Sequence, residues 1–203
     1  MKLYKLTALT LTAVLAAISV AGCGQKTKKI EPAHQQSSQI VYDDAEHIGE
    51  NKIKANLLET VSANDTVFTL KSVISPDNME DEGCNYIYFD VTIKNNSSTA
   101  YTLSTLNNFY LIMPDGTEVY SDIRTQLFAM SRFKENTYFS DPFEIPANGE
   151  FSGIVGGFLL DKNAESFTVG FFPTKDSPRA KGDVMLIDVA ASDIKAPDAS
   201  IMK

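Results

Sequence analysis

Apolar and polar side chains alternate strictly between Asn85 and Lys94, and this pattern leaves little choice of local structure. One face would carry Ile87, Phe89, Val91 and Ile93, and the other Tyr86, Tyr88, Asp90, Thr92 and Lys94. Because successive side chains of a strand point to opposite faces, the segment predicts a β-strand with one face on a hydrophobic core. The polar cluster at residues 95–98 is expected to end it in a turn.

Similar short segments follow along the chain, separated by turn signals. The sequence Met113-Pro114-Asp115-Gly116-Thr117 predicts a tight hairpin, because proline fixes the bend and glycine adopts positive φ readily. A second turn signal is found at residues 146–149, and only the ranges 53–61 and 123–133 are compatible with helices. The other expected strands are Thr66–Ile74, Ala100–Leu103, Asn108–Met113, Glu118–Tyr120, Phe151–Leu160, Ser166–Phe172 and Val184–Val189.

Strands of this number and length predict an all-β domain, an antiparallel β-sandwich of immunoglobulin-like architecture. We place it at residues 51–191 and expect a C-terminal tail at 192–203. The chain has no tryptophan and two cysteines. The sandwich is therefore expected to lack the core disulfide and the core tryptophan of antibody domains.

Residues 1–22 have the layout of a signal peptide. Lys2 and Lys5 precede an uncharged apolar run that is shorter than the roughly 20 residues of a membrane-spanning helix. The sequence Val20-Ala21-Gly22-Cys23 resembles a bacterial lipobox, in which the cysteine thiol receives the lipid. We therefore expect cleavage before Cys23 and an extracytoplasmic domain anchored to the cell membrane by lipid. An ordinary secretory signal and an uncleaved helical anchor are the alternatives.

Residues 23–50 are polar and irregular, which indicates a flexible tether behind the lipidated cysteine. Loss of the signal peptide takes the net charge from −8 to about −10. Such an acidic surface repels nucleic acid and anionic lipid headgroups, so neither is expected to bind the domain. With lipid on Cys23, no intramolecular disulfide is expected.

The stretch Phe89-Asp90-Val91-Thr92-Ile93-Lys94-Asn95-Asn96-Ser97 resembles the strand and turn of an immunoglobulin-like family of unknown function, common in bacterial secreted lipoproteins. Residues 109–112 with Asp115-Gly116 match that family's next hairpin. Residues 145–150, followed by Gly153 and Phe158, match a later segment, in which Asn148 is an insertion-like departure. The resemblance spans about residues 50–190. It implies a β-sandwich on a lipid anchor and brings no catalytic or ligand residue with it.

Groups that support catalysis are scarce in the expected domain. His34 and His47, the two histidines, lie in or beside the tether, which disfavours a catalytic triad and a histidine-based metal site. No glycine-rich phosphate loop is present, and no cofactor is expected. One acidic cluster between strands is a weak calcium candidate, because calcium takes about six to eight oxygen ligands from such loops. It comprises Asp77, Glu80, Asp81 and Glu82.

Tyr86 and Tyr88 lie on the outward face of the 85–94 strand. An exposed aromatic row of this kind predicts a contact surface for a protein or glycan. The alternative is that the second sheet, a helix or a loop covers this face.

These observations predict a non-enzymatic binding or interaction module of the cell envelope. It would be held at the membrane through lipid on Cys23, with a protein or an envelope polymer as its partner. Two alternatives remain open: an accessory subunit of an envelope or export complex, and a carboxylate-dependent hydrolase. The hydrolase requires two carboxyl groups within about 10 Å of each other in a cleft.

Overall fold

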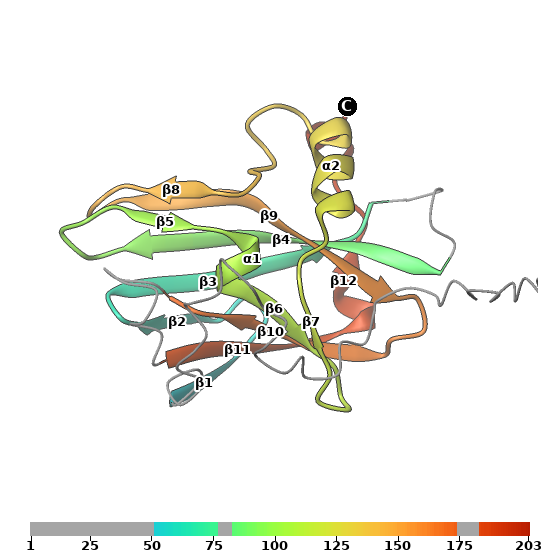
Figure 1. Cartoon of the computed structure of the whole chain (residues 1–203), viewed down its shortest axis with the longest axis horizontal. Coiled ribbons are helices and arrows are strands. Elements are labelled where there is room, and N and C mark those ends of the chain that lie inside the picture. The colour runs from blue at the N-terminus through green and yellow to red at the C-terminus, as the bar shows by residue number, and fades with distance from the viewer. Residues whose placement is uncertain (1–50, 77–82, 174–182) are drawn as a thin grey trace, which may run out of the picture.

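The computed structural model describes residues 51–76, 83–173 and 183–203 (Figure 1). The helices are α1 (Thr105–Asn108) and α2 (Ile123–Arg132), with single 3-10 turns at Ala191–Asp193 and Ala199–Ile201. The strands are β1 (Asn51–Asn56), β2 (Thr60–Ala63), β3 (Thr66–Ile74), β4 (Cys84–Asn95), β5 (Tyr101–Leu103), β6 (Phe109–Ile112), β7 (Glu118–Val119), β8 (Phe143–Ile145), β9 (Glu150–Asp161), β10 (Ser166–Phe171), β11 (Asp183–Ala190) and β12 (Ile194–Lys195).

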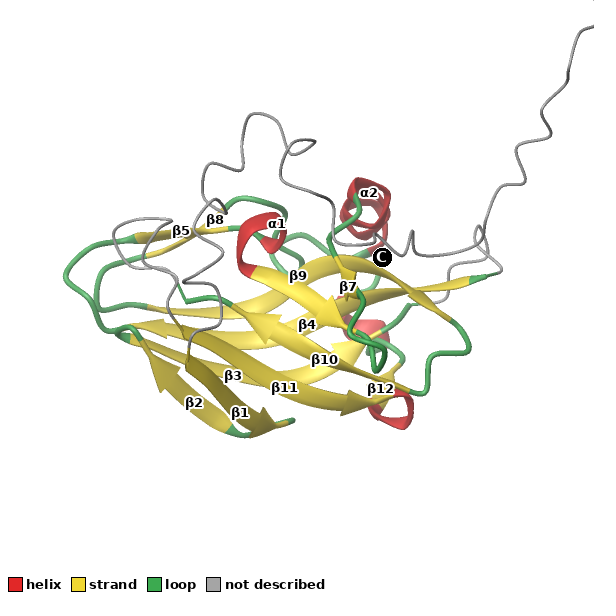
Figure 2. Cartoon of the chain, turned by 60° about the horizontal axis from the view of Figure 1, so that its bottom comes forward, coloured by secondary structure: helices red, strands yellow, loops and turns green. Residues whose placement is uncertain are grey.

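Two sheets form a β-sandwich, which confirms the predicted fold class. The first sheet has the order β1-β11-β10-β6-β7, and the second has the order β12-β3-β4-β9 with β2 also paired to β3. A two-stranded ribbon, β5-β8, extends from one end. Most pairs are antiparallel, while β1 with β11 and β12 with β3 are parallel. Figure 2 shows the two sheets as stacked layers, with α2 outside the layer of β4 and β9.

The core between the sheets is built by the alternation in β4. Ile87, Phe89, Val91 and Ile93 are fully buried there, as predicted. Aromatic rings fill much of the remaining space, for example Phe68 and Phe171 with ring centroids 4.5 Å apart. Full burial of one such side chain stabilises the fold by about 1.5–3 kcal/mol. The apolar side chains of β4 thus determine which side of the strand packs against the core.

The two predicted turns form through local backbone chemistry. Gly116 adopts a φ of 80° and its amide donates to the Met113 carbonyl at 2.8 Å. At the second turn the Gly149 amide donates to the Pro146 carbonyl at 3.0 Å. The buried Asn95 side chain joins this second turn to the end of β4, because its amide donates to the carbonyls of Thr99 and Pro146. The first turn therefore sets the register of β6 with β7, and the second connects β8 to β9 beside the end of β4.

The helical alternative for residues 53–61 is wrong, because this range contains the end of β1, a turn and the start of β2. Ile53 and Ala55 alternate with exposed lysines, which suits an edge strand. Leu58 turns the chain with a φ of 73°. By contrast, the helix expected at 123–133 is confirmed as α2. The short elements α1, β8 and β12 were not expected, because each is too brief to show a periodic pattern.

The segment expected as a C-terminal tail packs onto the domain. β12 pairs with Val73 and Ile74 of β3, and Met202 forms an isolated bridge with Phe133, just after α2. The Lys203 amide donates to the Arg132 carbonyl at 2.8 Å. The end of the chain is therefore a strap, residues 191–203, that runs from the first sheet to the end of α2.

Cys84 is the only cysteine among the described residues, and no disulfide joins the two sheets. It is fully buried at the start of β4 and takes part in a disulfide bond. The other cysteine of the chain, Cys23, lies outside the described residues. The expectation of no intramolecular disulfide is thus not confirmed.

The signal peptide and the tether also lie outside the described residues. Within residues 51–76, 83–173 and 183–203, no helix has the length and apolar character needed to cross a bilayer.

Candidate functional site

Helix α2 begins at a strong N-terminal cap. The Asp122 carboxylate accepts a hydrogen bond from the Arg124 amide at 2.8 Å and forms an ion pair with the Arg124 guanidinium at 2.8 Å. The hydrogen bonds from the Arg124 side chain hold the pKa of Asp122 below its usual range, and burial opposes them in part. A carboxylate at this position also complements the helix dipole.

The other end of α2 is closed by lysines. Lys203 donates through Nζ to the Met130 carbonyl at 2.8 Å, which satisfies one of the last carbonyls of the helix. Lys134 donates through Nζ to the Ser200 carbonyl at 2.7 Å and so ties the end of the helix to the strap. Both contacts place positive charge where the helix dipole is negative.

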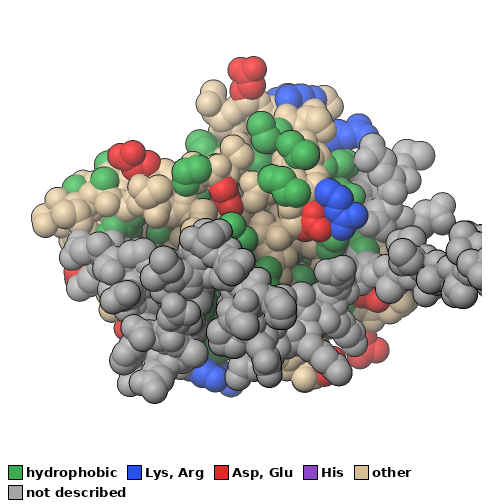
Figure 3. Space-filling model, viewed as in Figure 1, with side chains coloured by type: hydrophobic (Ala, Val, Ile, Leu, Met, Phe, Trp, Pro, Cys, Tyr) green, Lys and Arg blue, Asp and Glu red, His purple; other side chains and the backbone are tan. Residues whose placement is uncertain are grey.

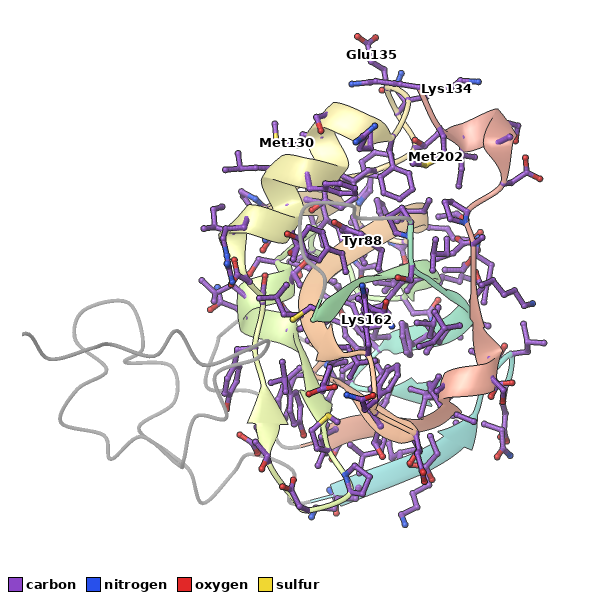
Figure 4. The ribbon with its side chains drawn as sticks, turned by 90° about the vertical axis from the view of Figure 1, so that its right-hand side faces the viewer. Tyr88, Met130, Lys134, Glu135, Lys162 and Met202 are labelled. Carbon is purple, nitrogen blue, oxygen red and sulfur yellow. The ribbon has the colours of Figure 1, made fainter. Side chains whose placement is uncertain are left out.

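The inner face of α2 covers Tyr86 and Tyr88. Both tyrosines are buried, and the Phe128 ring packs edge-on against Tyr86 with centroids 5.1 Å apart. The Tyr88 hydroxyl donates to the Thr125 carbonyl at 2.5 Å. Figure 4 shows Tyr88 between the helix and the sheet. The prediction of an exposed tyrosine contact surface is therefore wrong, and a helix covers this face, as the alternative allowed.

Gly157 lets the helix approach the sheet closely. A Cβ atom at this residue would lie 2.5 Å from the Thr125 hydroxyl oxygen, and its φ is 138°. The pairing of β4 with β9 shifts its register next to this point, between Ile87 and Tyr88. The shift and the missing side chain together leave room for the first turn of α2.

The carboxylate of Asp141 connects α1 to α2. It accepts hydrogen bonds from the Thr105 amide at 2.7 Å and the Leu106 amide at 3.1 Å. The Gln126 side chain of α2 donates to the same carboxylate at 3.1 Å. This shared partner holds the short helix α1 directly beside α2.

The outer face of this pair of helices is apolar and open to solvent. Ile123, Leu127 and Met130 are 67%, 60% and 54% exposed, and Leu106 of α1 is 52% exposed. The three α2 residues have the spacing i, i+4, i+7, which places them on one side of the helix. Figure 3 shows hydrophobic side chains gathered over α2. We call Leu106, Ile123, Leu127 and Met130 the α2 face.

Positive charge surrounds the α2 face in an acidic protein. The helix itself contains Arg124 and Arg132 and no acidic residue, although the whole chain has a net charge of −8. The Arg132 guanidinium lies over the Phe128 ring, 5.4 Å from its centroid. Lys134 and Lys203 lie at the end of the helix. The acidic neighbours include Glu135, Asp122, which is paired with Arg124, and Asp141, which accepts hydrogen bonds from the Leu106 amide and from Gln126.

The sequence analysis missed the α2 face, although its signal is visible in the sequence. The spacing of Ile123, Leu127 and Met130 indicates an apolar stripe, and such a stripe ordinarily faces the core. Here Thr125 and Gln126 face inward instead. Their polar groups are satisfied, since the Thr125 hydroxyl donates to the Asp122 carbonyl at 2.6 Å and Gln126 donates to Ser121 and Asp141.

The other predicted sites lie outside the described residues. These are Cys23, the two histidines, and the calcium candidate formed by Asp77, Glu80, Asp81 and Glu82. Within the described ranges, no group of three or more histidine, cysteine or acidic side chains is placed to hold a metal ion.

An open groove of about 440 Å³ lies at the start of β10 and the end of β11. Two of its lining residues are Asp188 and Asp193. Thr168 donates to the Asp188 carboxylate at 2.6 Å, and Asp193 accepts a bond of 3.3 Å from the Ala190 amide. The Asp188 carboxylate therefore links β11 to β10, and the Asp193 carboxylate caps the start of the strap.

The chain matches a known family of protein domains. Residues 55–173 match a family described as a domain of unknown function, DUF4352. The chain belongs to the DUF4352 family. The matched region of the DUF4352 domain runs from the end of β1 to just beyond β10 and includes α2. It leaves out β11 and the strap.

Solved structures similar to this DUF4352 protein have low sequence identity. The ycdA protein of Bacillus subtilis is 13% identical with a TM-score of 0.47, over 72% of this chain and 41% of that one. The yjhA protein of the same organism is 18% identical with a TM-score of 0.45, over 68% and 98%. An uncharacterized β-sandwich protein of Clostridium difficile is 12% identical with a TM-score of 0.42, over 68% and 95%. No curated protein matches the chain.

Proposed function

We propose that this DUF4352 protein is a lipid-anchored, extracytoplasmic lipoprotein that acts as a non-enzymatic interaction module of the cell envelope. The signal-peptide layout of residues 1–22 and the lipobox resemblance at Val20–Cys23 support the location. The α2 face is the observation that supports the binding role, and it is the contact surface in this proposal.

The α2 face is rigid as well as exposed, which suits a binding surface. Its helix is held by the Asp122 cap, by the Tyr88 hydroxyl and by the Asp141 carboxylate. A surface that is already ordered loses little conformational entropy on binding. A contiguous group of exposed apolar side chains with polar surroundings is typical of an interaction site.

The test is site-specific photo-crosslinking in living cells. A photoreactive amino acid replaces Leu127 of the α2 face in one full-length variant and Lys54 of edge strand β1 in another. Both positions are exposed, but Lys54 lies in the first sheet and Leu127 lies outside the second. We expect light-dependent adducts with an envelope component at position 127 and not at position 54. Equal labelling at both positions, or none at either, would contradict the proposal.

A further inference from the structure

We infer that the α2 face lies in the surface of the membrane to which the domain is anchored, with Arg132 and the nearby lysines against anionic lipid headgroups. This inference rests on the proposed lipid anchor at Cys23. It names the component that the α2 face contacts: the bilayer surface.

The shape of the α2 face suits a bilayer surface. The helix lies flat on the outside of the second sheet, and Met130 projects away from the domain (Figure 4). Interfacial helices lie in the plane of the membrane with their apolar side about 5–10 Å deep in the headgroup boundary. Ile123, Leu127 and Met130 point outward together along about 10 Å of helix, so all three enter such a boundary at the same depth.

A second copy of the chain suits the α2 face less well than a bilayer surface does. A stable protein interface buries about 800 Å² on each partner. The α2 face offers four apolar side chains, three of them on a single ten-residue helix. A membrane surface has no such minimum area, because the lipid anchor already supplies most of the binding free energy.

The local charge favours anionic lipid. Arg132 belongs to the helix and Lys134 and Lys203 follow it, while the charge of Arg124 is offset by Asp122. The acidic residues elsewhere on the domain repel an anionic surface, but salt screens charges beyond about 8 Å. At contact distance the headgroups therefore interact mainly with the cations around α2. We still expect the other faces of the domain to be repelled by anionic lipid.

The tether is long enough to allow this contact. β1, where the described chain begins, belongs to the first sheet, while α2 lies beyond the second (Figure 4). Residues 23–50 comprise 28 residues, which reach up to about 95 Å when extended. Anchoring also gives the α2 face a millimolar effective concentration at the membrane, so a weak intrinsic affinity is sufficient.

The test uses tryptophan fluorescence, because the natural chain has no tryptophan. The mature chain, residues 23–203, carries Cys23→Ser so that no lipid is attached, and either Leu127→Trp or Lys54→Trp. Each protein is titrated with vesicles of phosphatidylglycerol and phosphatidylcholine in equal parts, and with vesicles of phosphatidylcholine alone. Brominated lipids then report the depth of the indole, and circular dichroism checks that each variant is folded.

We expect a blue shift and quenching by brominated lipid for Leu127→Trp with the anionic vesicles, and neither change for Lys54→Trp. Adding Ile123→Ser and Met130→Ser to Leu127→Trp should weaken vesicle binding at least about tenfold, because two apolar side chains no longer enter the interface. Adding Arg132→Gln should weaken it with anionic vesicles only. No response to anionic vesicles, equal responses at both indoles, or an equal response to phosphatidylcholine alone would overturn the inference.

The vesicle test and the crosslinking test together distinguish failure of membrane docking from failure of the proposed function. Protein adducts at position 127 without any vesicle binding would overturn membrane docking and leave the proposed interaction module standing. Vesicle binding without lipid on Cys23 in cells would show that the proposed anchor is wrong while the α2 face still binds bilayers.

Discussion

The hydroxyl of Tyr88 in β4 donates a hydrogen bond of 2.5 Å to the main-chain carbonyl of Thr125 in α2. This contact joins the best-predicted strand of the chain to the helix that presents the α2 face. It also gives a polar role to a tyrosine that is otherwise packed against Phe133 and Tyr138.

Replacing Tyr88 with phenylalanine should destabilise the domain by about 1–2 kcal/mol, because the buried Thr125 carbonyl loses a hydrogen bond. Chemical denaturation measures the loss, and hydrogen exchange should increase first in α2. Tyr120→Phe is the control, since that hydroxyl is exposed and bonds to Glu118, two residues away in the chain, and we expect a change within about 0.5 kcal/mol. Equal losses of stability in the two variants would show that the Tyr88 hydrogen bond contributes no more to folding than the Tyr120 hydrogen bond.

Replacing Gly157 with alanine should displace α2 from the sheet. The new Cβ atom would meet the Thr125 hydroxyl oxygen, and the φ of 138° is unfavourable for any other residue. We expect a loss of more than about 3 kcal/mol in the free energy of unfolding. Gly116→Ala is the matched control, because nothing lies within 4 Å of its Cβ position and only about 1–2 kcal/mol of backbone strain remains. A smaller loss at Gly157 than at Gly116 would contradict the close approach.

The Asp122 cap should make the stability of α2 sensitive to acid. Its pKa is lowered in the folded state, so its contribution is complete above the unfolded value of about 4 and is lost as pH falls through the folded value. Asp122→Ala should cost about 1 kcal/mol at neutral pH. Asp122→Asn keeps a capping oxygen but not the charge, so its stability should depend less on pH below about 4. Thermal unfolding across this range measures both effects, and an unchanged acid profile in the asparagine variant would refute the assignment.

Three tyrosines, two of them buried and Tyr138 partly buried, should resist ionisation at high pH. Burial raises the pKa of Tyr88, Tyr110 and Tyr138 above the ordinary value of about 10. Their contribution to stability is therefore complete below pH about 10 and is lost as the pH rises further. Ultraviolet titration should show that these three of the eight tyrosines ionise only as the protein unfolds. Ionisation of all eight in a single step near pH 10, with the fold intact, would contradict their burial.

Lipid at Cys23 is a direct prediction of the lipobox resemblance. Cells that express the full chain and are fed labelled palmitate should label the protein, and Cys23→Ser should abolish the label. Cys84→Ser is the matched control and should keep it. Intact mass should then show two acyl chains or more on the mature protein. A mature protein that carries no lipid on Cys23 would contradict the prediction.

The sandwich could be predicted from sequence because its main signals are local. The alternation of Ile87, Phe89, Val91 and Ile93 requires one buried face whatever the rest of the chain does. Gly116 in its hairpin likewise acts through its own backbone. The helix at 123–132 was also visible, since three apolar residues recur at helical spacing.

Only the tertiary structure determines which element covers each face of a strand or helix. A period of two shows that Tyr86 and Tyr88 share a face of β4, but α2, some 40 residues later in the chain, buries them. The apolar stripe of α2 faces outward because Thr125 and Gln126 find hydrogen-bond partners on the inside, and Gly157 leaves room for them. Local pattern determines which residues lie together, whereas long-range packing and polar satisfaction determine which side is turned to solvent.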